Sequence, residues 1–254
     1  MAAKGDEGGD LVRSMDLLWG MADRPSRGPR PRLSVEQITR TAVEIADAEG
    51  LGAVSMQRIA ATFGFTTMSL YRYVPGKADL VALMVDMAIG ERPDLDAVPD
   101  GWRDRLAEWA RQCLRIFTRR PWLLEATSGH RVMGPNELGW MDAALAILAA
   151  AGFTPVEQHD AFLLVVGHVR SVAQYTSGAD RLRVDEWSVA VGERLTRHAD
   201  HFPAVVAAIQ GGGYAKAADE PLEFGLRCLL GGLEKLLAQD SVDTSPFGRE
   251  RPEY

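Results

Sequence analysis

The sequence contains little cysteine and no long apolar run. Its two cysteines, Cys113 and Cys228, lie in apolar helical patterns without the spacing of metal ligands, which predicts packed, reduced thiols. No apolar stretch reaches the ~18 residues that a membrane-spanning helix needs. The letters MDLLWGMA at 15–22 lack the basic flank of a signal peptide. We therefore expect a cytoplasmic protein that does not enter a membrane.

Motifs of catalysis are missing as well. The chain has no Gly-x-Ser-x-Gly pattern, and no Ser/His/Asp arrangement or close pair of carboxylates stands out as catalytic. The GGG at 211–213 lacks the strand, the lysine and the spacing of a phosphate loop. We predict no enzymatic activity, no cofactor and no metal. With 46% hydrophobic and 25% charged residues, the composition is that of an ordinary globular protein.

Charge is distributed unevenly along the chain. The formal net charge is -7, yet residues 24–40 hold five arginines against one glutamate, and residues 86–254 hold 18 basic against 25 acidic residues. An anionic partner is therefore expected to meet the N-terminal part. The letters RPSRGPRPR at 24–32 alternate proline and glycine with arginine, which favours an extended basic arm. A solvated linker is the alternative for this segment.

Helix signals begin after this arm. Ser34 and Gln37 form a capping-box pattern, and the apolar period that follows ends at Gly50. A second, short helix is predicted after Ser55 and ends at Gly64. A third of about two turns follows until the Pro-Gly pair at 75–76, and a fourth begins directly after it. Two short helices joined through a glycine turn and supported by a preceding helix indicate a helix-turn-helix motif.

The third predicted helix has an unusual surface. Leu70 and Val74 are its clear core positions, so residues on the other side of this helix face outward. Short or hydrogen-bonding side chains suit a helix that enters the major groove of DNA, which is ~12 Å wide. The alternative is a plain helical hairpin whose tyrosines are half-buried packing residues. The outward set comprises Thr67, Met68, Ser69, Arg72 and Tyr73.

Three stretches within residues 33–86 carry a family resemblance. They are Ala42, Ile45, Glu49 and Gly50 at the close of the first helix, IAATFGF at 59–65, and LYRYVPGKADL at 70–80. On these residues the segment resembles the DNA-binding domain of the TetR family of bacterial transcriptional repressors. The resemblance covers about a fifth of the chain. It implies a DNA-binding repressor that recognises operator DNA.

The resemblance assigns base-reading roles to three positions and a base or phosphate contact to a fourth. Thr67, Met68 and Ser69 match the outward face at the start of the family's recognition helix. Gln57 lies in the second helix, where family members often place a residue that reaches a base or a phosphate. Glutamine can pair with adenine through two hydrogen bonds.

Backbone contacts are implied for a further set. Tyr71 and Tyr73 match aromatic positions that contact the operator backbone, and Lys77 matches the lysine that anchors a phosphate at the start of the fourth helix. Arg72 occupies a variable family position, so its role stays open. By their chemistry, the arm arginines could enter a minor groove or grip phosphates; these are Arg27, Arg30 and Arg32.

The remainder of the sequence is predicted to be helical. After a Pro/Gly/Asp break at 90–101, a helix with an aromatic face begins at Trp102. Further helices are predicted at 136–151, 155–177, 185–201 and 220–239, and the 155–177 helix is apolar nearly all round, which predicts burial on two sides. The fold class is therefore all-α. The expected domains are a flexible basic arm (1–32), a three-helix helix-turn-helix domain (33–86), a larger helical ligand-binding and dimerisation domain (87–240) and a disordered tail (241–254).

Glycines interrupt the leucines of the 220–239 helix. Because glycine costs about 1 kcal/mol of helix propensity, Gly225, Gly231 and Gly232 predict the close approach of another helix, from the same chain or from a second copy. The resemblance implies a homodimer through the 155–177 and 220–239 helices. Two recognition helices on one two-fold axis would then read a palindrome with half-sites about 34 Å apart or a multiple of that.

The resemblance also implies a small-molecule effector that binds in the C-terminal domain and releases the DNA. Family matches do not transfer pocket residues, so we select amphipathic and aromatic residues on apolar faces, each of which also fits simple core packing. Two other function classes stay open: an all-α enzyme or carrier with a structural hairpin, and an activator or architectural DNA binder. The pocket candidates are Trp109, Phe117, Arg131, Trp140, His168 and Tyr175.

Overall fold

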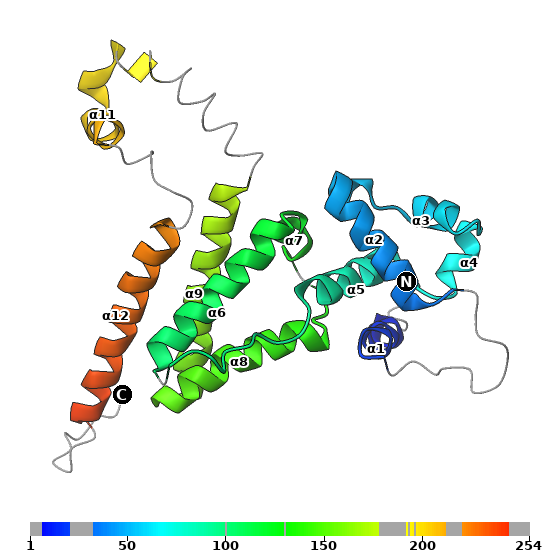
Figure 1. The fold of residues 1–254 in the computed structure, drawn as a ribbon, viewed down its shortest axis with the longest axis horizontal. Coiled ribbons are helices and arrows are strands. Elements are labelled where there is room, and N and C mark those ends of the chain that lie inside the picture. Colours follow the sequence, from blue (N-terminus) through cyan, green and yellow to red (C-terminus); the bar gives the residue numbers. More distant parts are fainter. Residues whose placement is uncertain are drawn as a thin grey trace, which may run out of the picture. The chain divides into compact units, whose positions relative to one another are not determined.

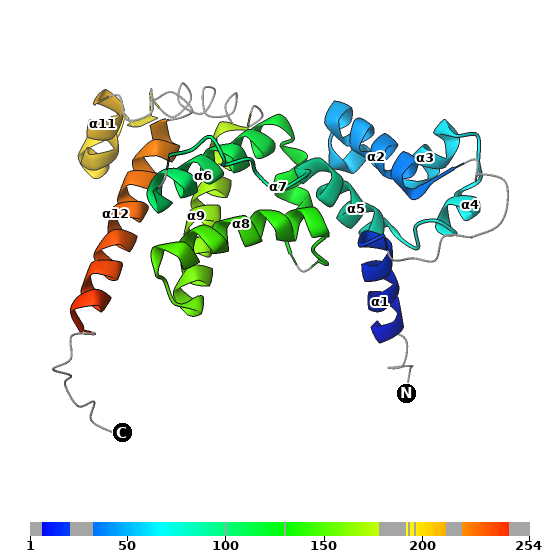
Figure 2. The same ribbon diagram turned by 60° about the horizontal axis from the view of Figure 1, so that its bottom comes forward.

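The computed structural model describes most of the chain, and in that part every regular element is a helix (Figures 1 and 2). The chain divides into two compact units. Unit 1 consists of residues 1–94 and 119–143, and unit 2 consists of residues 95–118 and 144–254. None of the described helices combines the length and apolar character required to cross a membrane. The described residues are 7–20, 33–99, 101–129, 131–177, 192, 194–195, 197–211 and 220–243.

The predicted helix-turn-helix is present in unit 1. It consists of α2 (Val35–Glu49), α3 (Met56–Thr62) and α4 (Thr67–Tyr71), with a single 3-10 turn, η1 (Leu51–Ala53), between the first two helices. The capping box of α2 forms as expected: the Ser34 hydroxyl accepts from the Gln37 amide, and the Gln37 side chain accepts from the Ser34 amide. Gly64 ends the turn after α3 with a φ of 69°, in the left-handed region that glycine tolerates.

The fourth predicted helix, α5 (Lys77–Ile89), supports this motif. Its Leu80 and Met84 are fully buried, and α5 packs along α2. The structure adds a helix that the sequence did not predict. Residues expected to belong to a flexible arm form α1 (Glu7–Leu18), which packs against α5 (Figure 2). Leu18 is buried there, and the Ser14 hydroxyl hydrogen-bonds the Asp79 carboxylate.

Two further elements complete unit 1. The short helix α7 (Trp122–Ala126) packs against α5 and η1, and it buries Trp122 and Leu123. The first half of α8 (Pro135–Ala151) also belongs to this unit, which ends at Ala143.

Unit 2 is built mainly from long helices. They are α6 (Trp102–Arg119, whose last residue falls in unit 1), α9 (Pro155–Thr176) and α12 (Glu220–Asp243), and α12 packs along α9. The aromatic face of α6 is buried as predicted, including Trp109 and Phe117. A 3-10 turn, η2 (Ala199–His201), precedes α11 (Pro203–Gln210). Most of the predicted helix at 185–201 lies outside the described residues, as does the tail from 244.

The prediction that α9 is buried on two sides is wrong for the single chain. Val165, Val169 and Val172 form a buried face, whereas Leu163 and Leu164 are half exposed. The sequence correctly indicated an apolar helix, but periodicity alone does not tell which side the same chain covers.

Candidate nucleic-acid interface and effector region

The start of α4 presents the predicted base readers. Helix α4 ends at Tyr71 and is shorter than the two turns predicted. Leu70 on α4 and Val74, three residues after its end, have no exposed surface and fix this segment on the core of unit 1. Met68 is 75% exposed on the opposite face, and Thr67 and Ser69 are half buried beside it. This outward face therefore consists of two hydroxyls and a thioether, as the sequence predicted.

A hydroxyl pair organises the first turn of α4. The Thr66 side chain caps the helix by accepting from the Ser69 amide at 3.4 Å. The two hydroxyls, Thr66 Oγ1 and Ser69 Oγ, lie 3.0 Å apart, and either can donate to the other. Rotation of one hydroxyl would release the other for a base edge, so this pair can hydrogen-bond in the free and in the bound protein.

The predicted backbone-contacting residues surround the end of α4 and the start of α5. Tyr71 and Lys77 are exposed, and Tyr73 is half buried. Lys77 is the first residue of α5, whose N-cap is Gly76 and therefore supplies no capping side chain. The first amide N–H groups of a helix attract anions, and a lysine there adds a full positive charge.

The other predicted DNA contacts are placed as follows. Gln57 is exposed on α3, and Arg72 is exposed at the end of α4. The next residue on α3, Arg58, instead joins Glu49 through its Nη1, 2.8 Å from Oε2, and this hydrogen bond lowers the pKa of Glu49. Arg30 and Arg32 lie outside the described residues.

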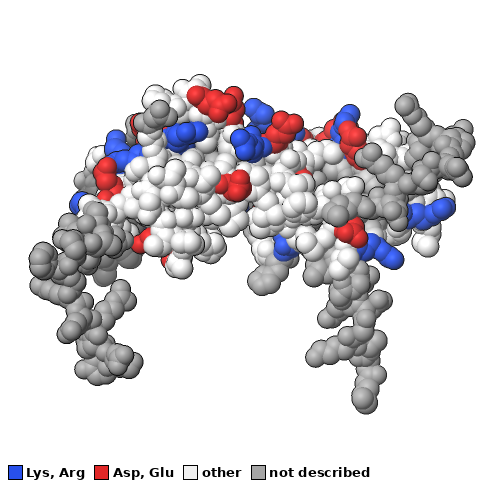
Figure 3. All heavy atoms as spheres, turned by 90° about the horizontal axis from the view of Figure 1, so that it is seen from below, with Lys and Arg blue, Asp and Glu red and all other residues white. Residues whose placement is uncertain are grey.

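Charges of both signs are interspersed on the face shown in Figure 3, without a broad region of one sign among the described residues.

The effector candidates of unit 2 lie on α6 and α9. Trp109 is 1% exposed and packs edge-to-face on Phe162, with ring centroids 5.9 Å apart. Phe117 is also buried, and the Arg170 guanidinium lies 5.5 Å from its ring centroid. The sequence analysis named the two α6 residues and missed Arg170, because only the packing of α9 on α6 brings this arginine to an aromatic face.

His168 and Tyr175 have different surroundings on α9. The His168 Nε2 lies 3.3 Å from the Leu222 carbonyl oxygen of α12, and its ring lies against Gly225, where an added Cβ would come within 2.8 Å of Cδ2. Tyr175 is 48% exposed. Gly225 is therefore the glycine at which α12 approaches a helix of its own chain, whereas a Cβ at Gly231 or Gly232 would meet open space.

Arg131 and Trp140 belong to unit 1. Arg131 forms an ion pair with Glu137, with Nη1 2.6 Å from Oε2, and the two side chains are 17% and 15% exposed. The Trp140 indole N–H donates to the carbonyl oxygens of Gly90 and Glu91, at 3.2 and 2.8 Å. The six predicted effector residues thus do not form one cluster within a single unit.

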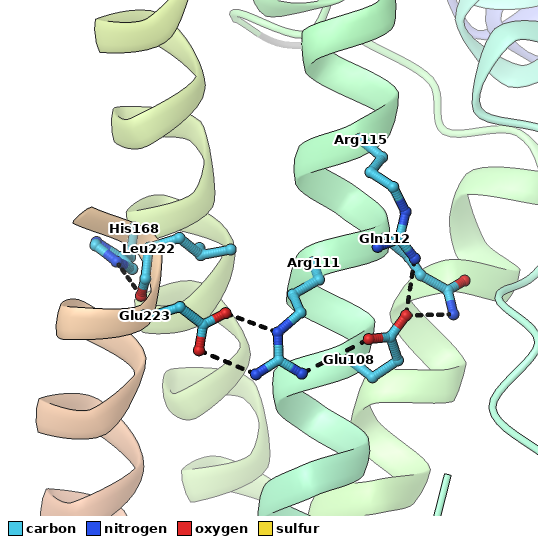
Figure 4. Close-up of polar contacts among 7 residues, drawn as sticks. All are labelled: Glu108, Arg111, Gln112, Arg115, His168, Leu222 and Glu223. Atoms are coloured by element: carbon cyan, nitrogen blue, oxygen red, sulfur yellow. Dashed lines mark hydrogen bonds and ion pairs between the residues drawn. The ribbon is translucent and has the colours of Figure 1, made fainter. Parts of the chain in front are cut away.

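A chain of charged groups joins α12 to α6 in unit 2 (Figure 4). Arg111 donates two hydrogen bonds to Glu223, at 2.7 and 3.0 Å, and also pairs with Glu108 at 3.6 Å. Arg115 bonds the other oxygen of Glu108 at 2.8 Å. The hydrogen bond from Arg111 lowers the pKa of Glu223. These contacts join α12 to α6 through charged side chains rather than through apolar packing.

The fold and the arrangement of α3, α4 and α5 define a class of protein: a helix-turn-helix DNA-binding protein with a large helical C-terminal region. Among the described residues no group of His, Cys, Asp and Glu could hold a metal ion.

Comparison with known proteins identifies the family. Residues 38–84 match the family description "Bacterial regulatory proteins, tetR family", and residues 93–237 match "Tetracyclin repressor-like, C-terminal domain". The chain is 36% identical over 248 residues to the HTH-type transcriptional repressor DrrR1 of Streptomyces coeruleorubidus, covering 94% of this chain and 91% of that protein. This chain belongs to the TetR family of transcriptional regulators.

Further proteins are similar to this chain in sequence or in fold. The tetracycline repressor protein class C of Escherichia coli is 26% identical over 211 residues, which cover 81% of this chain and 92% of that one. The Streptomyces coelicolor protein ActR in complex with actinorhodin has a TM-score of 0.71 at 25% identity, covering 83% and 99% of the two chains. A TetR variant of Acinetobacter baumannii in complex with minocycline has a TM-score of 0.59 at 20% identity, covering 81% and 98%.

Proposed function

We propose that this protein represses transcription as a homodimer by reading a palindromic operator through α4, and that a multi-ring aromatic small molecule releases it. The observation that carries the proposal is the outward face of α4, fixed by two fully buried residues, Leu70 and Val74, beside an α5 N-terminus that carries Lys77. Thr67, Met68, Ser69 and Gln57 read bases. Tyr71, Tyr73 and Lys77 hold phosphates, and Arg30 and Arg32 add backbone or minor-groove contacts.

The division between residues that read bases and residues that hold phosphates can be tested by mobility shift. The two probes are the DNA that flanks the protein's own gene and random-sequence DNA. Lys77→Ala should weaken binding to both and lower the slope of log affinity against log salt by about one. Thr67→Ala and Ser69→Ala should instead change the preference at one base position. Lys235→Ala removes an exposed lysine of α12 and serves as the control. Equal losses on both DNAs for every variant would contradict this assignment.

Dimerisation through α9 and α12 is supported by apolar side chains that their own chain leaves exposed. Leu163 and Leu164 on α9 and Phe224 and Leu236 on α12 are between 49% and 58% exposed. A second copy packed on both helices would bury these groups in a four-helix bundle. Leu164→Asp and Phe224→Asp should shift the protein from dimer to monomer in sedimentation analysis. Val12→Asp, at a similarly exposed position on α1, should leave the dimer intact.

The effector class is suggested by the structural relatives that bind actinorhodin and minocycline and by the aromatic groups on α6 and α9 of unit 2. Trp109, Phe117 and Phe162 offer ring faces and edges, and Arg170 offers positive charge for a phenolate or carboxylate. Actinorhodin and minocycline are the probes. Binding that raises the unfolding temperature, releases the DNA and is weakened by Phe117→Ala but not by Phe202→Ala, an exposed control, would support the assignment. Release of DNA by a probe whose binding Phe117→Ala leaves unchanged would contradict it.

A further inference from the structure

One arginine of unit 2 has a buried polar atom without a partner. Arg105 lies on α6 and is half buried, and its Nε is shielded from solvent and makes no hydrogen bond. No ion pair or hydrogen bond joins its side chain to another of the described residues. An arginine is always charged, and a charged group that is removed from water is unfavourable unless an anion pairs with it. A buried donor of this kind requires an explanation.

The arginines around Arg105 do not share this feature. Three others on α6 each have a glutamate partner, namely Arg103, Arg111 and Arg115. A second buried Nε without a partner belongs to Arg131, but the Nη1 and Nη2 of that guanidinium bond Glu137. The charge of Arg131 is therefore compensated by a carboxylate of its own chain, whereas the charge of Arg105 is not.

Aromatic rings flank Arg105. Residues three and four positions apart are neighbours on a helix surface, which places Arg105 between Trp102 and Trp109. The Trp102 ring packs edge-to-face on Phe153, with ring centroids 5.6 Å apart, and Trp109 packs edge-to-face on Phe162 at 5.9 Å. All of these residues belong to unit 2. The unpaired arginine thus lies in the aromatic part of the proposed effector region.

This part of α6 is also shielded from water. Leu106, the residue after Arg105, has no exposed surface. Burial alone raises the pKa of the Cys113 thiol, one turn beyond Trp109. Because charges attract more strongly where water is excluded, an anion that reached Arg105 would pair with it more strongly than with an exposed arginine.

We propose that Arg105 binds the anionic group of the effector, and that the effector is therefore a multi-ring aromatic acid. The proposal rests on the proposed effector function and names the residue that holds the charged group. One edge of a guanidinium, formed by Nε and one Nη, donates two parallel hydrogen bonds to a carboxylate, so the buried Nε supplies one of these donors. The rings of the acid pack against the neighbouring tryptophans. The Arg170 guanidinium instead lies 5.5 Å from the Phe117 ring centroid.

Two probes of matched shape test the need for negative charge. Anthracenecarboxylate is an anion at neutral pH, whereas the corresponding carboxamide is neutral. Isothermal titration calorimetry measures the affinity of each probe for the full-length protein without DNA. The carboxylate should bind roughly 10- to 100-fold more tightly than the carboxamide. Arg105→Met should abolish this preference by weakening the binding of the carboxylate alone, and Arg105→Lys should retain part of it.

A control variant and a second measurement separate binding from a structural role. Arg115→Met removes an exposed arginine of the same helix that is paired with Glu108, and it should leave the preference for the carboxylate unchanged. Without any probe, Arg105→Met should unfold at the same or a higher temperature than the unmodified protein, because it removes an unpaired buried charge. An arginine with only a structural role would instead lower this temperature by about 2–4 °C when replaced. If Arg105→Met does not fold, Arg105→Gln decides.

The outcomes distinguish this proposal from the proposed function. Equal affinities of the two probes, a preference that survives in Arg105→Met, or no binding of the carboxylate at millimolar concentration would each overturn the role of Arg105. Release of DNA by both probes at equal concentrations overturns that role as well, but leaves the proposed effector function standing. A carboxylate that binds through Arg105 without releasing DNA supports the anion site and contradicts the proposed effector function.

Discussion

The two units of this protein join their helices by different means. In unit 1 the joints are carboxylates that accept from an indole and from backbone N–H groups, at Asp47 and Asp86. In unit 2 they are arginine–glutamate pairs with side chains 38% to 57% exposed, such as Arg111–Glu223 and Arg103–Glu234. Asp86 is a short, buried acceptor with few alternative partners, whereas a long, solvated pair exchanges readily with water. The difference teaches that unit 1 contains a joint held by a buried acceptor at Asp86, whereas these charged joints of unit 2 stay in contact with solvent.

Substitution of one glycine in each unit should give the largest difference in stability loss between the two units. At Gly134 an added Cβ would overlap the Asp86 carboxylate and come within 2.7 Å of the Asp86 Cβ, and this side chain is too short to move aside without losing its two backbone donors. At Gly225 the overlap is with the tip of the His168 ring, which can rotate away. We expect Gly134→Ala to lower the free energy of unfolding by about 1–3 kcal/mol, and Gly225→Ala to lower it by less. Urea unfolding measures both, and equal losses would remove the contrast.

Removal of the Asp86 carboxylate should cause the next largest loss of stability. Asp86→Ala leaves the Asn136 and Glu137 amides without their partner and should cost about 1–2 kcal/mol. Asp86→Asn keeps an oxygen acceptor and should cost less. Thermal unfolding of both variants at neutral pH checks this order. A milder effect for alanine than for asparagine would show that the carboxylate is not needed as a cap.

The pH dependence of stability should have opposite signs at Asp86 of unit 1 and at Glu223 of unit 2. Burial raises the pKa of Asp86 above its ordinary value of 3.8, so the folded state holds this proton more tightly, and the residue's contribution to stability falls as pH rises above about 3.8. The hydrogen bond from Arg111 lowers the pKa of Glu223 below 4.5, so its contribution is present above pH 4.5 and is lost as pH falls. Asp86→Asn should therefore gain relative stability with rising pH, and Glu223→Gln should lose it. Urea midpoints between about pH 3.5 and 6.5 record both trends.

The smallest loss of stability is expected when the exposed Arg111–Glu223 pair is broken. Arg111→Met keeps most of the apolar stem and removes the charge, and because exposed ion pairs contribute about 0–1 kcal/mol, the loss should stay within that range and shrink in high salt. The same measurement on Arg120→Met, whose guanidinium reaches Asp47 and the Ala88 carbonyl, should give a larger loss. Similar losses at both arginines would erase the distinction between the units.

Much of the DNA-binding side could be predicted from local sequence. Ser34 with Gln37 predicted the start of α2, and Leu70 with Val74 predicted the residues by which α4 and the segment after it are buried. Helix caps and apolar spacing act over a few residues, so they can be recognised without the fold. The helix α1 was not predicted, because its docking depends on Leu18 and Ser14 meeting a partner about 65 residues away.

The effector region was less predictable for a related reason. Trp109 and Phe117 were chosen because they are aromatic and lie on an apolar helix face, and the structure places both on the buried face of α6. Arg131 and Trp140 were chosen by the same criterion, yet the structure engages Arg131 with Glu137 and Trp140 with the end of α5, within unit 1. Residue type shows what a side chain can bind, whereas the contacts that occupy it depend on packing.

The sequence by itself therefore determined most of the helices, the family and the residue types that face outward on α4, because caps, apolar periodicity and motif spacing are local. Only the tertiary structure decided that α1 docks on α5, that Gly225 but not Gly231 approaches a helix of its own chain, and that residues 119–143 join the DNA-binding unit. Each of these depends on groups such as Asp47 and Trp122, which are 75 residues apart and meet at 2.7 Å only when the chain is folded.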